Sequence, residues 1–145
     1  MTFMVIMVSA CLMGNNCRYK GDSCKNDNVL KYVAGHDVIA VCPEVMGGLS
    51  TPRSPSEIVG DKVMNKDGID VTREYMAGAE MALKLARENH VELCIMKSKS
   101  PSCGCGRIYD GSFTGGMVDG DGVTVALLKK NGFKVLTELE IEQMV

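Results

Sequence analysis

The amino-acid sequence predicts an α/β fold: a single three-layer domain with a mainly parallel central sheet and helices on both faces. Short apolar runs alternate along the chain with segments of helical periodicity, as is typical of strands joined by helical crossovers. The runs contain few polar positions, which indicates a sheet covered on both faces. No internal repeat and no long linker interrupts the 145 residues. We therefore expect one domain over residues 1–145.

Four apolar runs are the predicted strands. They are residues 4–8, 38–41, 91–96 and 133–136. The apolar start of the chain ends at Ser9, lacks a basic flank and is too short to span a bilayer. We interpret it as a buried first strand and expect neither a secretory signal nor a membrane span.

Helical segments lie between these runs. The strongest covers residues 72–89, with Thr72 as its predicted cap. Its predicted apolar stripe consists of Met76, Ala79, Leu83 and Ala86. Shorter helices are expected from Asp22 or Ser23 to about Ala34, over residues 123–130 and over residues 138–144. Residues 47–55 contain a glycine pair and two prolines, so we expect an irregular loop there.

Composition and charge exclude several classes of protein. Hydrophobic residues make up 46% of the chain and charged residues 23%, which indicates a globular rather than a disordered chain. The net charge of −2 provides no overall attraction to nucleic acid or to an anionic membrane. We expect a cytoplasmic protein that has no membrane attachment and forms no stable nucleic-acid complex.

The cysteines carry the strongest functional signal. There are seven, an odd number, so a disulfide framework is not expected in a chain without a secretory signal. Reduced thiols are either core residues or metal and redox ligands. Cys94 lies inside a predicted strand and is interpreted as core. Cys11, Cys42 and Cys103 instead lie in loops, each after a different predicted strand.

These three loops are expected to meet, because the carboxyl ends of parallel strands lie at one edge of a sheet, where ligands bind. Cys17 follows Cys11 by six residues and can turn back to the same edge. Structural zinc usually has cysteine pairs with two to four residues between them, which this chain lacks, because Cys103 and Cys105 have only one residue between them. The sequence thus favours one thiolate-rich metal site, and an iron–sulfur cluster over zinc.

Polar side chains lie near these cysteines. Glu44, two residues after Cys42, is a candidate general acid or base, with a solvated loop glutamate as the alternative. Five further residues are candidates for substrate binding, either as cations for an anionic group or as hydroxyls: Arg18, Arg53, Lys97, Ser98 and Ser102. Surface charges and a serine-capped polar turn are the alternatives.

Four groups of motifs, in this order, resemble the thiouracil desulfidase family. They are residues 9–14 with 17–19, residues 42–45 with 47–49 and 52–53, residues 97–104, and residues 108–111. The resemblance covers the chain from Ser9 to about Leu128. The run Ser-Pro-Ser-Cys-Gly, followed by Ile-Tyr-Asp-Gly, is its most specific part.

The resemblance implies a [4Fe–4S] cluster held by Cys11, Cys42 and Cys103, while Cys17 also matches a recurrent cysteine of the family. It implies that a fourth iron acts as a Lewis acid on the substrate sulfur, and that Glu44 and Ser100 orient the attacking water. The implied reaction converts 2-thiouracil to uracil and releases hydrosulfide without net redox change. The resemblance leaves open whether the free base, the nucleoside or the nucleotide is the substrate.

Two other functions use the same cysteines. A non-catalytic sulfur or metal carrier would need the thiols but not Glu44. A zinc-stabilised binding domain would need neither iron nor a general base. Cys105 departs from the family pattern. It would serve either as an additional ligand or as a site of oxidation.

Overall fold

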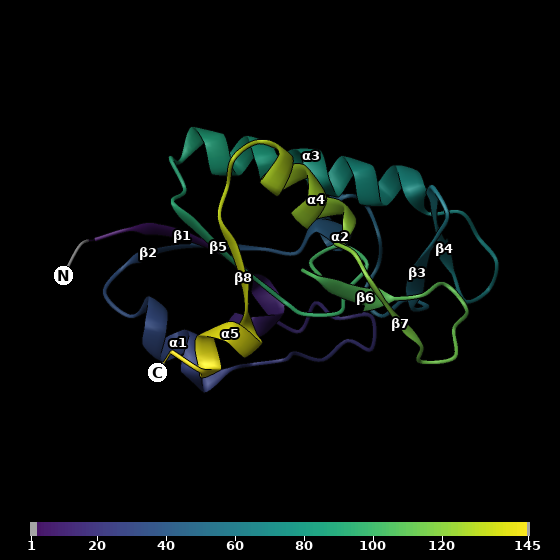
Figure 1. Ribbon diagram of the computed structural model, residues 1–145, viewed down its shortest axis with the longest axis horizontal. Helices are drawn as coiled ribbons and strands as arrows, with labels where there is room; N and C mark the ends of the chain where they lie inside the picture. The colour runs from purple at the N-terminus through teal and green to yellow at the C-terminus, as the bar shows by residue number, and fades with distance from the viewer. Residues whose placement is uncertain (1–2, 145) are drawn as a thin grey trace.

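The computed structural model describes residues 3–144 (Figure 1). Its central layer is a four-stranded sheet in the order β2-β1-β5-β8, and all neighbouring strands are parallel. The strands are β1 (Val5–Ser9), β2 (Asp37–Val41), β5 (Leu93–Met96) and β8 (Val135–Thr137). The predicted α/β class is therefore confirmed. The first two residues of the apolar start and the last residue of the expected domain lie outside the described residues.

Helices cover both faces of the sheet (Figure 1). One face carries α3 (Thr72–Glu88) and α4 (Val123–Lys130), and the other carries α1 (Asp27–Val33) and α5 (Glu138–Glu142). Strand β1 serves both cores, because Met7 packs on the α3 side while Ile6 and Val8 pack on the α1 side. No helix within residues 3–144 has both the length and the apolarity needed to cross a bilayer.

Several short elements were not predicted, although the sequence over residues 108–113 indicates a short extended piece and a turn. The 3₁₀ turn η1 (Ala10–Met13) follows β1, and α2 (Pro43–Met46) follows β2. Two antiparallel hairpins lie on the right in Figure 1, beyond the carboxyl ends of the sheet. They are β3 (Ser56–Val59) with β4 (Lys62–Asn65), and β6 (Arg107–Tyr109) with β7 (Met117–Asp119). These strands are only three or four residues long, so they carry little periodicity.

The predicted start of the first helix was wrong. Helix α1 begins at Asp27, after Asn26, whose side chain accepts a hydrogen bond from the Val29 amide at 3.0 Å. Asp22 is instead paired with Arg18. Strand β2 is also less buried than predicted, because it is an edge strand of the sheet and residues such as Ala40 are exposed.

Three of the four residues predicted for the apolar stripe of α3 are buried, namely Ala79, Leu83 and Ala86, but the prediction for Met76 was wrong. Met76 is 51% exposed, whereas Tyr75 is 1% exposed and faces the interior. Thr72 does not cap the helix; its hydroxyl accepts a hydrogen bond from the Val63 amide at 2.8 Å. The stripe therefore ends in an aromatic ring with a polar tip, which reaches the site described below.

Helices α2 and α3 cross with their backbones in contact. A Cβ atom added at Gly78 of α3 would overlap the carbonyl group of Pro43 in α2. Similarly, a Cβ atom at Gly47, the C-cap of α2, would overlap the carbonyl group of Glu74. Only glycine permits this approach, which fixes the short α2 against the long α3.

Gly78→Ala tests this contact. In an unconstrained helix interior, alanine is more stable than glycine by about 1 kcal/mol. Here we expect the opposite sign, with a loss of roughly 1–3 kcal/mol in the free energy of unfolding, because the methyl group has no space. Denaturant unfolding measures the difference. Met76→Ala on the exposed face is the control and should change stability by less than about 0.5 kcal/mol. A stabilising Gly78→Ala would contradict the close contact.

Candidate active site

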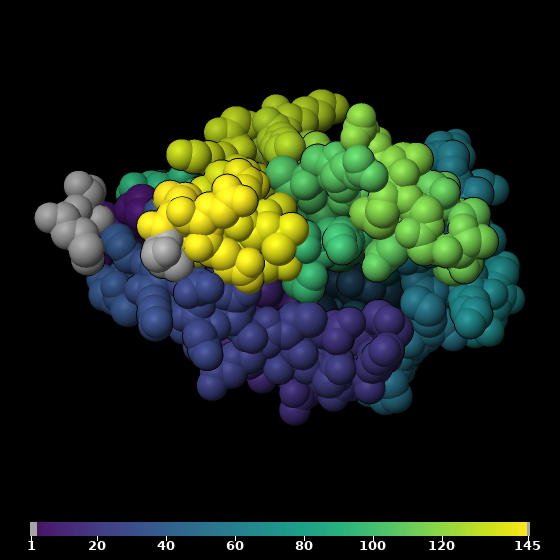
Figure 2. All heavy atoms as spheres, turned by 60° about the horizontal axis from the view of Figure 1, so that its bottom comes forward, coloured from purple at the N-terminus to yellow at the C-terminus, as the bar shows by residue number. Residues whose placement is uncertain are grey.

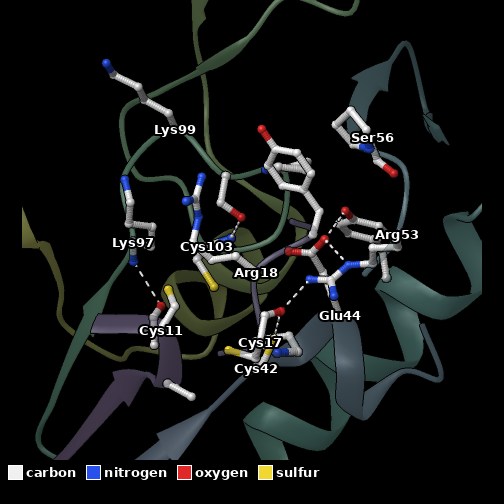
Figure 3. A pocket seen from close by; sticks show the side chains of 18 of the residues that line it. Cys11, Cys17, Arg18, Cys42, Glu44, Arg53, Ser56, Lys97, Lys99 and Cys103 are labelled. Atoms are coloured by element: carbon white, nitrogen blue, oxygen red, sulfur yellow. Dashed lines mark hydrogen bonds and ion pairs between the residues drawn. The ribbon is translucent and has the colours of Figure 1, made fainter. Parts of the chain in front are cut away.

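Four cysteines line one cavity of about 270 Å³ at the carboxyl edge of the sheet (Figure 3). Cys11 lies in η1, Cys42 between β2 and α2, Cys103 in the loop after β5, and Cys17 in the loop after η1. Figure 2 shows the surface hollowed between the purple N-terminal segment and the green segment that follows β5. The structure thus brings together thiols that lie up to 92 residues apart (103 − 11).

Parallel pairing explains this convergence. Strand β1 is hydrogen-bonded to β2 on one side and to β5 on the other, both in parallel register. All three strands therefore end at the same edge, and the residues that follow them begin there. Local turns then orient the thiols: Gly14, at a φ of 104°, ends η1, and the Cys103 amide donates to Ser100 Oγ at 3.0 Å.

The thiols interact with one another. The Cys11 thiol raises the pKa of Cys17. The Cys17 side chain, together with burial, raises the pKa of Cys42, whose Sγ donates a hydrogen bond to the Cys17 carbonyl oxygen at 3.7 Å. Burial raises the pKa of Cys103 to about 12. Without a metal, Cys17, Cys42 and Cys103 are therefore protonated at neutral pH, and a bound metal would displace their protons.

The donor set fits an iron–sulfur cluster. All four thiols face one cavity, whereas no three His, Cys, Asp or Glu side chains within residues 3–144 are close enough together to hold a single metal ion. A zinc ion needs its sulfur ligands within about 2.3 Å of one centre. A cluster distributes its thiolates over several irons and so accommodates more widely spaced sulfurs. The spacing therefore fits a cluster better than zinc.

Glu44 lies in the first turn of α2 and lines the cavity. Its Oε1 accepts hydrogen bonds from the Tyr75 hydroxyl at 2.5 Å and from Arg53 Nε at 3.4 Å. Tyr75 was missed by sequence analysis, although a polar-tipped aromatic residue on the buried face of α3 was the available signal. Burial and the nearby Glu44 charge raise the pKa of Tyr75, so its hydroxyl remains a donor.

Arg53 lines the cavity and is held by several hydrogen bonds to the protein. Its side chain is 8% exposed, and all three guanidinium nitrogens donate hydrogen bonds. Besides Glu44, the guanidinium donates to the Cys17 carbonyl and the Ser50 carbonyl, each at 3.0 Å. Arg53 therefore joins the loops around the cavity that it lines, and its role in substrate binding stays a prediction.

Lys97 and Ser98 line the cavity, but their polar groups are directed to the buried Glu138. The Ser98 hydroxyl donates to Glu138 Oε2 at 2.8 Å, and Lys97 Nζ lies 3.1 Å from the same oxygen. Arg18 also lines the cavity, with its side chain 28% exposed and paired with Asp22 at 3.0 Å. These contacts hold the cavity walls in place.

The two remaining serines differ. Ser100 lines the cavity, and its Oγ accepts hydrogen bonds from the Ser102 and Cys103 amides at 3.1 and 3.0 Å. Among residues 3–144 its hydroxyl donates to no partner, so its hydrogen is available to donate into the cavity. Ser102 does not line the cavity: its side chain is fully buried and its hydroxyl pairs with that of Thr124 at 2.9 Å. The assignment of Ser102 to substrate binding is therefore corrected.

Cys105 and Cys94 are not among the residues that line this cavity. Cys94 is fully buried in the core, as predicted. Cys105 is half-buried and packs against the same core near Lys129. The cavity is also lined by Glu57 and Tyr75, which sequence analysis did not single out, and by three residues of the family motifs that it gave no role: Tyr19, Lys99 and Tyr109.

One family of known proteins matches this chain over most of its length. Residues 6–140 match the family model described as 2-thiouracil desulfurase. The chain belongs to this family. The motif resemblance found in the sequence is thereby confirmed.

Two relatives cover almost the whole chain. The uncharacterized protein YbbK of Bacillus subtilis (strain 168) is 41% identical over 150 residues, which include 97% of this chain and 99% of YbbK. The solved structure of the [4Fe-4S]-dependent thiouracil desulfidase TudS is 44% identical and superposes with a TM-score of 0.91. That comparison covers 97% of this chain and 94% of the TudS chain. The family likeness therefore extends to the full architecture around the cavity.

Ser102→Ala tests the corrected placement. The change leaves the Thr124 hydroxyl buried without its partner, so we expect a loss of about 1–3 kcal/mol in the free energy of unfolding. Denaturant unfolding measures this loss. Thr124→Ala should cost a similar amount, and the double variant should cost less than the sum of the two. An unchanged stability in both single variants would contradict the buried pair.

Thiol reactivity tests the raised pKa of Cys103. In the reduced, metal-free protein, the thiolate fraction of Cys103 should keep rising up to about pH 12, so its alkylation rate should not level off between pH 7 and 10. In guanidinium chloride, the same cysteine should be half ionised near its ordinary pKa of about 8.5, so its rate should level off toward pH 10. Peptide mapping by mass spectrometry after iodoacetamide pulses measures both rates. A rate that levels off toward pH 10 in the folded protein as well would contradict the burial effect.

Proposed function

We propose that this protein is an iron–sulfur enzyme that removes sulfur from a thiolated pyrimidine, converting 2-thiouracil to uracil and releasing hydrosulfide without net redox change. One observation carries the proposal: four thiols and a firmly held carboxylate line the same cavity. Membership of the 2-thiouracil desulfurase family and the likeness to TudS support it.

The proposed cofactor is a [4Fe–4S] cluster held by Cys11, Cys42 and Cys103. These three follow β1, β2 and β5 most closely, whereas Cys17 lies further along a loop and is the alternative ligand. The chemistry that such a cluster supplies when bound is Lewis-acid polarisation of the carbon–sulfur bond. The protein supplies the remaining groups.

Glu44 is the proposed base. Its Oε1 is occupied by Tyr75 and Arg53, so the proton of an attacking water would be taken up at Oε2. Ser100 is proposed to donate its hydroxyl hydrogen to the oxygen of that water, because its own oxygen already accepts two amide hydrogen bonds. Together they would orient one water molecule for attack on the thiocarbonyl carbon.

Arg18 is the proposed substrate-binding cation, because its side chain is the most exposed of the cavity arginines. Lys97 and Ser98 are proposed to form the cavity wall through Glu138. The substrate is the free base, the nucleoside or the nucleotide of 2-thiouracil, and the assay below distinguishes the three. We propose the cytoplasm as the location, because all seven cysteines are free thiols, which a reducing compartment maintains.

A carrier of sulfur or metal is the second candidate. It would use the same thiols but would not need a carboxylate held by two buried donors. The contacts of Glu44 with Tyr75 and Arg53 therefore favour the enzyme. The spacing of the thiols disfavours a zinc-stabilised binding domain.

Anaerobic reconstitution with iron and sulfide tests the proposal. We expect a brown protein that releases hydrosulfide from at least one of 2-thiouracil, its nucleoside and its nucleotide. Glu44→Gln should keep the visible absorption and lower kcat by about 10²–10⁴-fold, because the general base is lost. Serine substitutions at Cys11, Cys42 and Cys103 should each lower the iron content.

Cys24→Ser, which alters a half-buried thiol that does not line the cavity, is the matched control and should keep both colour and turnover. A reconstituted protein that binds a cluster but releases no hydrosulfide from any thiolated pyrimidine would contradict the enzyme and favour the carrier. Full activity of Glu44→Gln would contradict the role of Glu44.

A further inference from the structure

The two oxygens of Glu44 have different surroundings. Oε1 accepts hydrogen bonds from two donors, the Tyr75 hydroxyl at 2.5 Å and Arg53 Nε at 3.4 Å. Oε2 accepts none from residues 3–144. Within that part of the chain no buried side-chain oxygen lacks a partner, so Oε2 must be accessible. Because Glu44 lines the cavity, one oxygen is held by the protein and the other is left for a ligand.

This asymmetry restricts how the carboxylate can rotate. The last torsion of a glutamate side chain is broad when nothing holds it. A short hydrogen bond from a buried hydroxyl to Oε1 removes that freedom and sets the direction of Oε2. Tyr75 is 1% exposed, so water cannot easily replace its hydroxyl at this position.

The backbone contact between α2 and α3 explains why the hydroxyl reaches Glu44. Glu44 lies in the first turn of α2, and Tyr75 lies one turn before Gly78 on α3. Gly78 touches the carbonyl group of Pro43, the residue before Glu44. The separation of the two helices, and with it the distance from Tyr75 to Glu44, is therefore fixed by main-chain contact.

Arg53 connects Glu44 to the loop that carries Cys17. It donates to Glu44 Oε1 through Nε and to the Cys17 carbonyl through Nη2 at 3.0 Å. However, its contact with Glu44 is the longer of the two and it also joins two loops, so its removal would disturb more than the carboxylate. The Tyr75 hydroxyl is the group whose removal tests the orientation of Glu44 alone.

We propose that Tyr75 is a positioning residue for the desulfuration reaction: its hydroxyl holds Glu44 Oε1 so that Oε2 faces the substrate and its attacking water. This inference rests on the proposed function. Tyr75 itself touches neither the substrate nor the water and acts only through Glu44.

Tyr75→Phe removes the hydroxyl and keeps the packed ring. In the cluster-loaded enzyme we expect kcat for the best thiolated pyrimidine to fall about 10- to 100-fold, because a misoriented base loses near-attack geometry. KM should change less than about twofold, since uniform substrate binding is retained. Cluster absorbance per chain should be unchanged. Tyr32→Phe, on α1 and away from the cavity, is the matched control and should leave kcat and KM unchanged.

A double-mutant cycle separates positioning from a general structural effect. If Tyr75 acts through Glu44, Tyr75→Phe should cost less than about twofold in kcat when it is added to Glu44→Gln. An equal loss in both backgrounds would overturn the proposal, as would an unchanged kcat in the single variant. A rise in KM at constant kcat, or loss of the cluster absorbance, would also overturn it, because Tyr75 would then be a binding or a structural residue.

These outcomes are distinct from failure of the proposed function. If the loaded wild-type protein releases no hydrosulfide from any thiolated pyrimidine, the desulfidase assignment fails and the role of Tyr75 fails with it. If the wild-type protein is active and Tyr75→Phe equals it in kcat, only the positioning role is wrong.

Discussion

The parallel pairing of β1 with both of its neighbours is the constraint on which the site depends. Because β2 and β5 run in the same direction as β1, the chain leaves all three strands at one edge of the sheet. The residues that follow are Cys11, Cys42 and the loop that carries Cys103. No local interaction needs to bring these thiols together, since the sheet hydrogen bonds already do so. A reversed strand would move its cysteine to the opposite edge.

The glycine contact between α2 and α3 fixes the position of the site residues that stand at the start of α2. Helix α2 has only four residues, too few to be stable without tertiary contacts. The close approach at Gly47 and Gly78 holds it against a helix of 17 residues, which is itself packed on the sheet. Cys42 and Glu44 stand at the start of α2, so a thiol and a carboxylate share one rigid support. Tyr75 then determines which oxygen of that carboxylate faces the cavity.

The opposite wall of the cavity depends on buried polar contacts. Glu138, at the start of α5, accepts hydrogen bonds from the amide and the hydroxyl of Ser98 and pairs with Lys97. Ser100 and Ser102 then stabilise the turn that leads to Cys103, the first by accepting two amide hydrogen bonds and the second through Thr124. A serine-rich segment thus contains both structural hydroxyls and one that still faces the cavity. Residue type alone does not distinguish them, because every serine has the same donor and acceptor.

The sequence by itself determined the α/β class, the order of the main strands and helices, and the edge at which the cysteines meet. Apolar periodicity indicates the strands and helices, and their alternation along the chain indicates parallel pairing. The short hairpins and α2 carried too few residues for periodicity to reveal them. Only the tertiary structure decided that Arg53 joins loops, that Ser102 is buried and that Tyr75 rather than Met76 faces inward. These outcomes depend on the rotation of a helix and on partners distant in sequence, such as Cys17 for Arg53 and Thr124 for Ser102. Local sequence specifies which groups are available, whereas packing decides which of them remain free to react.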